Sequence, residues 1–397
     1  MRKAHYTVRD NEVQQHAADL LLRHLGLSDF SAKCTAEILL HVLFTAAARL
    51  SSIIAACLHL KNAPSKETIR KALLASLPDY AKLQKALNRA LAGDLPKPLR
   101  KRRQRLAIDL HLVPYYGEHW IDPKEIYRAN AKAGTNSFHA YASAYVVLRG
   151  QRYTVALTPV ERGENMKSVV QRLLGIARTA SVRPRLLLLD RGFYAVEVIR
   201  YLQAARVPFL MPAIARGRKP GPGKPAKGVR GFAQWKSSGW SKHRLNGAKG
   251  TATVSICVHC TNLRGQRRKR GRAAWVYAYW GIKPNSTRWV ADTYRERFGI
   301  ESSFRQLHQA RITTCTRNPA VRLFYVALAL ILRNVWVWFH WERLSSPRRG
   351  RRLLRLERLR FKTLLSWLQH MAEFILGVSK ETPTERKAKS PPGGAEA

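Results

Sequence analysis

Apolar residues recur with a helical period through the first part of the chain, between residues 10 and 95. The period is clearest in AADLLLRHLGL and in AEILLHVLFTAAARLSSIIAACLHL, where it predicts amphipathic helices that pack on one another. We therefore expect residues 1–95 to form an all-α domain.

A break in this pattern at Pro64 separates two of the predicted helices. Ser65 is suited to cap the second helix, which carries Lys66, Arg70 and Lys71. Two helices around such a break are typical of a helix-turn-helix, whose second helix reads DNA, and equally of a small helical bundle. In the first interpretation the all-α domain binds DNA.

Beyond the basic segment LPKPLRKRRQR the period changes from helical to alternating. LAIDLHLVPYYG predicts one strand, FHAYASAYVVLRGQRYTVALTPV predicts two more, and RPRLLLLD predicts a fourth that is buried on both faces. NMKSVVQRLLGIARTA and AVEVIRYLQAA have the spacing of helices. These elements make an α/β unit at 100–212, and the family resemblance given below implies that the helical residues 290–342 complete it.

A β-rich basic insertion is expected at 213–289, between the two parts of this unit, with the long strands TATVSICVHC and AAWVYAYWG. The helical pattern returns at Asp292, and we expect Asp292 and Thr293 to cap that helix. Basic helices, including RRLLRLERLRFKTLLSWL, are expected at 343–378, and a disordered tail at 379–397.

The net charge of the chain is its most unusual property. The 397 residues include 71 Lys+Arg and 25 Asp+Glu, a formal net charge of +46. Such an excess indicates a polyanionic partner, and nucleic acid fits better than a membrane surface. The best candidate for a membrane span, Leu323 to Leu332, is shorter than the required ~20 residues, and MRKAHYTVRDNEVQQH lacks the apolar centre of a signal peptide. We expect a cytoplasmic, nucleoid-associated protein without a membrane anchor.

The cysteines do not favour a metal site. Cys257 and Cys260 have the C-x-x-C spacing of a zinc ligand pair, but the sequence has no second such pair, and both lie in a strand-like run. We therefore expect free thiols.

Two aspartates stand out because each lies on an otherwise apolar strand, Asp109 in LAIDLHL and Asp190 at the end of LLLLD. Counting by twos along the first strand places Asp109 and His111 on the same, more polar face. An ionised carboxylate is costly to bury without a partner, and Mg²⁺ is usually held by one or two carboxylates together with phosphate oxygens. The pair therefore suggests a Mg²⁺ site for phosphodiester chemistry, which normally uses a third carboxylate.

A third carboxylate lies in DTYRERFGIESSFRQLHQARITT. On a helix, Tyr294, Arg297, Glu301 and His308 point within about 60° of one another and form one narrow stripe. A solvated polar face is the alternative interpretation of this stripe.

Together these residues resemble the DDE transposases of bacterial and archaeal insertion sequences, over the span from the first predicted strand to the helix that follows the stripe. Tyr294, Arg297 and Glu301 have the spacing of the Tyr-x2-Arg-x3-Glu-x6-Lys signature of a cut-and-paste group, and His308 stands where that signature has lysine. DRGFY, which begins at Asp190, is similar to the turn around the second acid of that group.

The resemblance implies a ribonuclease-H-like catalytic domain in which Asp109, Asp190 and Glu301 hold Mg²⁺, with Mn²⁺ as a substitute. It also implies cleavage at the transposon terminal inverted repeats, strand transfer into target DNA, and a homodimer that bridges two paired ends. The residues expected to contact DNA are Arg191, Tyr294, Arg297 and His308.

Basic loops and tryptophans of the insertion supply further candidates for DNA contacts. The loops at 215–231 and 264–272 are expected to follow phosphates. One tryptophan in or beside the insertion could stack on a flipped base, while most of them serve the core. These tryptophans are Trp235, Trp240, Trp275, Trp280 and Trp289.

Three other functions explain part of the pattern. A nuclease of the same fold would cut without transposing, and strand transfer into a second duplex separates it from a transposase. A non-catalytic basic nucleic-acid-binding protein explains the charge but not the three acids. A decayed transposase that still binds its ends stays open because His308 replaces the lysine.

Overall fold

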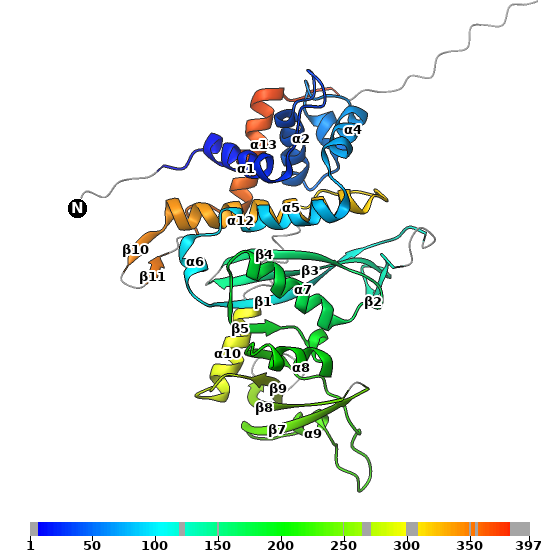
Figure 1. Cartoon of the computed structure of the whole chain (residues 1–397), viewed down its shortest axis with the longest axis vertical. Helices are drawn as coiled ribbons and strands as arrows, with labels where there is room; N and C mark the ends of the chain where they lie inside the picture. The colour runs from blue at the N-terminus through cyan, green and yellow to red at the C-terminus, as the bar shows by residue number, and fades with distance from the viewer. Residues whose placement is uncertain are drawn as a thin grey trace, which may run out of the picture.

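The computed structural model describes residues 7–118, 124–148, 151–248, 250–263, 271–298, 309–348, 351–353 and 356–381. Glu301 and His308, two of the predicted site residues, lie outside the described residues. In the described part, helices gather at one end of the molecule and a large mixed sheet extends toward the other (Figure 1).

The helices predicted for the first part of the chain are present, and the helix after Pro64 begins at the predicted cap. The Ser65 hydroxyl accepts a hydrogen bond from the Thr68 backbone N–H at 3.1 Å. The helices are α1 (Asp10–Leu25), α2 (Ala36–Ala48), α3 (Ile53–His59), α4 (Lys66–Ser76), α5 (Tyr80–Gly93) and the short α6 (Lys97–Lys101).

A helix from the other end of the chain completes this helical region. Helix α13 (Phe361–Leu376) packs against α1 and α2, and Figure 1 shows it beside them. The backbone N–H of Asn62 donates to the Leu376 carbonyl at 2.8 Å, and His59 Nε2 lies 2.7 Å from Glu373 Oε1. The region is therefore assembled from both ends of the sequence.

The prediction of a basic helix through RRLLRLERLRFKTLLSWL is wrong in its first part. Arg351–Leu353 is a short strand, β11, paired with β10 (Ser346–Arg348), and α13 begins only at Phe361. A helix in a globular protein is stabilised mainly by the apolar face that it buries, and the residues after Phe361 supply that face.

Nine of the described strands form one sheet, apart from the β10–β11 pair. Its order is β2-β3-β1-β5-β6-β9-β8-β7, with β4 paired to β3, and β1, β5 and β6 run parallel to one another. The strands are β1 (Gln104–Pro114), β2 (Tyr127–Lys132), β3 (Thr135–Leu148), β4 (Gln151–Val160), β5 (Pro184–Leu189), β6 (Phe209–Pro212), β7 (Gly239–Gly247), β8 (Gly250–Leu263) and β9 (Gly271–Trp280).

The sequence patterns missed β2, β6 and β7, and they did not reveal that β7, β8 and β9 continue the same sheet. The join is made by β6 and β9, where Phe209 pairs with Trp280 in an antiparallel ladder. Strand β6 has only four residues, and β2 and β7 are largely polar, so neither length nor alternation of apolar residues marked them.

The sheet is covered on both faces. Helices α7 (Met166–Thr179) and α8 (Val196–Ala204) belong to the hydrophobic core that includes Ile108 of β1. Helix α10 (Thr287–Phe298) packs on the opposite face, where its Tyr294 meets Ala107 and Leu188. Because side chains alternate along β1, the face of Ala107 is also the face of Asp109.

The predicted caps of α10 are wrong. The helix begins at Thr287, and the Ser286 hydroxyl accepts a hydrogen bond from the Trp289 N–H at 3.0 Å. Buried apolar residues of the first turns, Val290 and Ala291, pack on the sheet, so the helix extends N-terminally beyond the polar pattern from which it was predicted.

Two asparagines protect the outer edge of β4, along which α5 and α12 (Pro319–Phe339) lie (Figure 1). Asn334 of α12 accepts from the Thr154 N–H at 2.9 Å and donates to the Thr154 carbonyl at 2.7 Å. Asn88 of α5 makes the same pair of bonds with Leu157, at 2.7 and 2.9 Å. Each side-chain amide therefore makes hydrogen bonds to the backbone N–H and carbonyl of one edge residue, as a neighbouring strand would.

Helix α12 is longer than the ten-residue apolar run that marked it. Within the described residues, Pro319–Leu344 is long and apolar enough to cross a membrane, but 89% of its most apolar window is buried inside the protein. The helix also buries Arg333 and Asn334, so it serves as a core helix.

His139 of β3 makes stability depend on pH. It is 8% exposed, and burial, with the charge of Arg322, lowers its pKa to about 4. An unfolded histidine titrates near pH 6.5, so between pH 6.5 and 4 the unfolded chain binds the extra proton and the folded state loses stability as the pH falls. The difference between the pKa of His139 in the folded and unfolded states corresponds to about 3 kcal/mol of folding free energy.

We therefore expect the free energy of unfolding of the original protein to fall by up to about 3 kcal/mol more than that of His139→Gln between pH 7 and pH 4. Urea unfolding at several pH values measures this difference. Parallel pH profiles for the two proteins would show that His139 does not titrate in this way.

Candidate active site

Asp109 and Asp190 lie side by side because their strands are parallel neighbours in register. Ile108 of β1 is paired with Leu189 of β5, so the next residue on each strand is one of the two aspartates. Asp109 is 4% exposed, whereas the side chain of Asp190 is 50% exposed. The pair therefore has one buried carboxylate and one that is open to solvent.

Arg297 of α10 joins the two carboxylates. Its Nη2 lies 3.3 Å from Asp109 Oδ1, and its Nη1 lies 3.4 Å from Asp190 Oδ1. Burial favours the uncharged form of Arg297, but Tyr294, Asp109 and Asp190 outweigh it, so its pKa is raised. A buried, charged guanidinium thus sits between the two aspartates.

Tyr294 contacts the guanidinium of Arg297 that joins the two aspartates. Its side chain is 1% exposed and packs on Tyr277 at a centroid distance of 5.4 Å, and its hydroxyl accepts a hydrogen bond from Arg297 Nη1 at 3.1 Å. Burial raises its pKa well above the usual range. The stripe predicted on this helix therefore points inward at Tyr294 and Arg297 and does not form a solvated face.

Further polar residues surround Asp109 on the same face of the sheet. Ser143 of β3 is the register partner of Asp109, and its hydroxyl lies 2.7 Å from His111 Nε2. His111 is 6% exposed, so the polar face predicted for β1 is buried beneath the covering helices. Ser143 was not among the predicted site residues.

Two buried arginines near this face were also missed. The guanidinium of Arg152 lies 4.1 Å above the Tyr145 ring, and burial lowers its pKa to about 10. Burial and the neighbouring Arg152 lower the pKa of Arg333 to about 9. Arg152 is a charged residue in the apolar strand QRYTVAL, and Asp109 was marked because it is a charged residue in an apolar strand. The same criterion would therefore have found Arg152.

The aspartate pair fits a divalent cation. Asp109 Oδ2 is buried and has no hydrogen-bond partner among the described residues. Such an atom is costly to bury unless a cation or donor meets it, and one or two carboxylates are the usual protein ligands of Mg²⁺. The part of the chain that the structure describes contains no group of three potential metal ligands, and Glu301, the predicted third carboxylate, lies outside it.

The other predicted features are more dispersed. Arg191 is exposed in a short 3-10 helix directly after Asp190. Cys257 and Cys260 form no disulfide, and burial raises the pKa of Cys257 to about 12. Of the five tryptophans, Trp240 and Trp275 are the most exposed, at 43% and 51%.

The basic loop 215–231 is closed at its base, while residues 264–270 of the second loop lie outside the described part. Gly217 has a φ of +114°, and a Cβ built there would lie 2.1 Å from the Lys227 carbonyl oxygen. Gly217 therefore allows the two ends of the first loop to approach closely, and its lysines and arginines are largely exposed between them.

Adjacent carboxylates at the ends of parallel strands, in a strongly basic chain, are an arrangement typical of enzymes that act on nucleic-acid phosphodiesters with metal ions. A piggyBac transposase in a synaptic complex with hairpin DNA has a similar fold, with a TM-score of 0.51 and 10% identity over 91% of this chain and 80% of that chain. No curated protein matches the chain in sequence.

Residues 100–335 match the profile of the transposase DDE domain, and because this match covers more than half of the chain, the chain belongs to that family. It is therefore a DNA-binding enzyme of DNA transposition that depends on divalent metal ions. The predicted ribonuclease-H-like fold and the predicted transposase function are confirmed. The assignment to a bacterial or archaeal insertion sequence stays a prediction.

Proposed function

We propose that this chain is a cut-and-paste transposase that cleaves the terminal inverted repeats of its own element and joins them to target DNA. Asp109, Asp190 and Glu301 hold Mg²⁺ in this proposal, with Mn²⁺ as a substitute. The observation that carries it is the aspartate pair at the ends of β1 and β5, with the buried, unpartnered Asp109 Oδ2. When bound, the metal polarises the scissile phosphate and activates the attacking oxygen.

The two aspartates have different duties in this proposal. Asp109 is fixed by the sheet, and its Oδ1 accepts from the Leu110 N–H at 3.0 Å and from Arg297. Asp190 is half exposed, so it faces the side from which DNA must approach. Glu301 supplies the third carboxylate, and His308 contacts the DNA backbone beyond it.

Arg297 has two positions in the proposed cycle. Without DNA its guanidinium neutralises part of the charge of the aspartate pair, and with DNA and metal bound it contacts a phosphate, which arginine binds well through paired donors. Tyr294 acts on this side chain through its hydroxyl and does not reach the surface.

Removing the guanidinium should therefore strengthen metal binding in the absence of DNA. We expect Arg297→Gln to bind Mn²⁺ about tenfold more tightly than the original protein, because a positive charge between the two carboxylates is lost. Titration of Mn²⁺ followed by electron paramagnetic resonance measures this. The control is Arg295→Gln, which removes an exposed arginine from the same helix and should leave the affinity for Mn²⁺ unchanged. If Arg297→Gln bound Mn²⁺ no more tightly than the original protein, the idea that Arg297 and the metal compete for the two aspartates would be contradicted.

The helical region is proposed to bind the transposon ends through α4. Lys66, Arg70 and Lys71 are exposed, while Ile69 and Leu73 on the same helix are buried. We expect Lys66→Ala with Lys71→Ala to weaken DNA binding and to make it less dependent on salt, because fewer counterions are released. The comparison uses the full chain, since α13 completes the region, and Lys82→Ala on the neighbouring α5 is the control. Equal salt slopes would remove α4 from the interface.

Several finer features belong to the same proposal. The protein acts as a homodimer on paired ends and associates with the nucleoid. Arg191 and the loop 215–231 contact phosphates, and an exposed tryptophan, Trp240 or Trp275, stacks on a flipped base.

Strand transfer is the test that separates this function from its rivals. A DNA fragment that carries the genomic sequences flanking the gene is incubated with the protein, Mg²⁺ and a supercoiled target plasmid. Joined products are expected, and they must disappear when Mg²⁺ is replaced by EDTA. Cutting without joining would indicate a nuclease, and binding without cutting would indicate a non-catalytic protein or a decayed transposase.

A further inference from the structure

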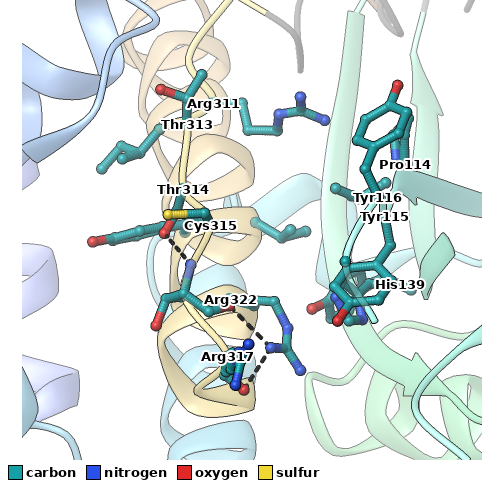
Figure 2. Close-up of a pocket in the computed structure, with 17 residues that line it drawn as sticks. Pro114, Tyr115, Tyr116, His139, Arg311, Thr313, Thr314, Cys315, Arg317 and Arg322 are labelled. Carbon is teal, nitrogen blue, oxygen red and sulfur yellow. Dashed lines mark hydrogen bonds between the residues drawn. The ribbon is translucent and has the colours of Figure 1, made fainter. Parts of the chain in front are cut away.

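A cavity of about 470 Å³ lies beyond the end of β1, outside the aspartate site. One wall is formed by Val113–Gly117 with His139 and Tyr141 of β3, and the other by residues 311–317 with the start of α12 (Figure 2). Its volume is in the range of pockets that bury a ligand of nucleotide size.

This cavity continues the face of the sheet that carries Asp109. In the ladder between β1 and β3, Asp109 is paired with Ser143, and four residues further along β1 Val113 is paired with His139. Alternation places Asp109 and Val113 on one face, and four residues of strand span about 13 Å. A DNA strand that passes the aspartates along this face would therefore reach the cavity within about 13 Å of Asp109.

One wall of the cavity is aromatic. Tyr116 is 71% exposed, and Tyr115 packs against His139 with a centroid distance of 4.8 Å. The lowered pKa of His139 keeps its imidazole neutral near pH 7, so this wall offers ring surfaces and no charge.

The other wall is cationic. Figure 2 shows Arg311 and Arg322 reaching from their own elements toward Tyr116 and His139. Arg322 is held by Glu125 and by the Thr316 carbonyl, whereas no described residue forms an ion pair with Arg311. No aspartate or glutamate is among the described residues that line the cavity, so none of these residues neutralises Arg311, which is half-buried there.

The cationic wall is fixed before any ligand binds. The Thr313 N–H donates to the Ser51 carbonyl at 3.1 Å, which ties the segment to the helical region. Ala310 and Ile312 on either side of Arg311 are 0% and 2% exposed. Arg311 is therefore presented to the cavity by a segment anchored in the core.

We propose that this cavity receives one unpaired nucleotide of the DNA strand that crosses the catalytic face, with its base against Tyr115 and Tyr116 and its phosphate on Arg311. The inference rests on the proposed function only in requiring that DNA lies along this face. Aromatic side chains receive flipped bases by stacking, and an arginine without an acidic partner is suited to phosphate.

The test measures a preference for an unpaired nucleotide in EDTA, where no cleavage occurs. The full-length protein is titrated into a labelled duplex with one bulged 2-aminopurine nucleotide, and into the same duplex fully paired. We expect about tenfold tighter binding of the bulged duplex, the effect of stacking one base, together with quenching of 2-aminopurine fluorescence. Tyr116→Ala and Arg311→Gln should each remove most of this preference.

Matched variants control for the loss of an exposed ring and of an exposed charge. Phe374→Ala removes a ring that is 85% exposed on α13, and Arg178→Gln removes an exposed arginine from α7, on the opposite face of the sheet. Both should keep the preference. Photo-crosslinking of a bulged 5-iodouracil to the peptide that contains Tyr115 and Tyr116 is the direct confirmation.

Two outcomes would overturn the inference: no preference in the original protein, or a preference that survives in both cavity variants. If the cavity inference failed in this way but the protein still carried out strand transfer, the proposed function would stand. If the protein did not bind DNA at all, both the inference and the proposed function would be wrong.

Discussion

Asp190→Asn and Asp109→Asn are each expected to lower cleavage of the transposon ends by at least about 10²–10³-fold, while DNA binding changes by no more than about threefold. Asparagine keeps the shape of the side chain but removes the negative charge that a divalent cation requires. Cleavage is measured on labelled duplex that carries the end sequence with Mg²⁺, and binding is measured in EDTA.

Asp109→Asn should be less stable than Asp190→Asn, although both variants lose the same activity. Asp109 is buried beside Arg297, so its replacement leaves a buried guanidinium with one acidic partner fewer, whereas Asp190 is half exposed. Asp292→Asn, which changes an exposed aspartate of α10, is the matched control and should cleave normally. Normal cleavage by either of the first two variants would exclude that residue from the active site.

Asn334→Leu is expected to lower the free energy of unfolding by about 3–5 kcal/mol. The side chain is 1% exposed and makes three hydrogen bonds to backbone groups, two to Thr154 and one to the Leu91 carbonyl at 2.9 Å. Leucine has a similar volume but would leave these buried groups without a partner, at about 1–3 kcal/mol for each. Urea unfolding followed by circular dichroism measures the change.

The matched control for this prediction is Asn246→Leu, because Asn246 is exposed on β7 and its replacement buries nothing. It should change the free energy of unfolding by no more than about 0.5 kcal/mol. If Asn334→Leu were as stable as the original protein, water or another side chain would have to satisfy the edge of β4, and the asparagine would not be needed there.

The sequence predicted the aspartate pair because an acid in an apolar strand is a strong local signal. Asp109 and Asp190 were marked by the apolar pattern of their own strands, and the chemistry of Mg²⁺ and the family resemblance linked them; their parallel, in-register strands were seen only in the structure. Tyr294 and Arg297 were found by helical spacing, but their inward orientation was not, because a polar stripe looks the same whether it faces solvent or a buried partner.

What the sequence did not predict depends on contacts between distant segments. Ser143 and Arg152 approach Asp109 only through the register of β3 and β4. Strands β6 and β7 are defined by their neighbours in the sheet, since neither has a clear alternation of its own. The cavity beyond β1 likewise unites residues near 115, 139 and 311, and no local pattern connects them.

The position of α13 has a consequence for the timing of synthesis. The helical region needs this helix, yet more than 300 residues separate the end of α2 from Phe361. At about 5–20 residues per second, α2 leaves the ribosome roughly 15–60 s before α13, and the sheet with its aspartates leaves the ribosome within that interval. A chain that stops before Phe361 would carry both aspartates but an unfinished helical region, so the surface proposed to bind the transposon ends is complete only after α13 has been made.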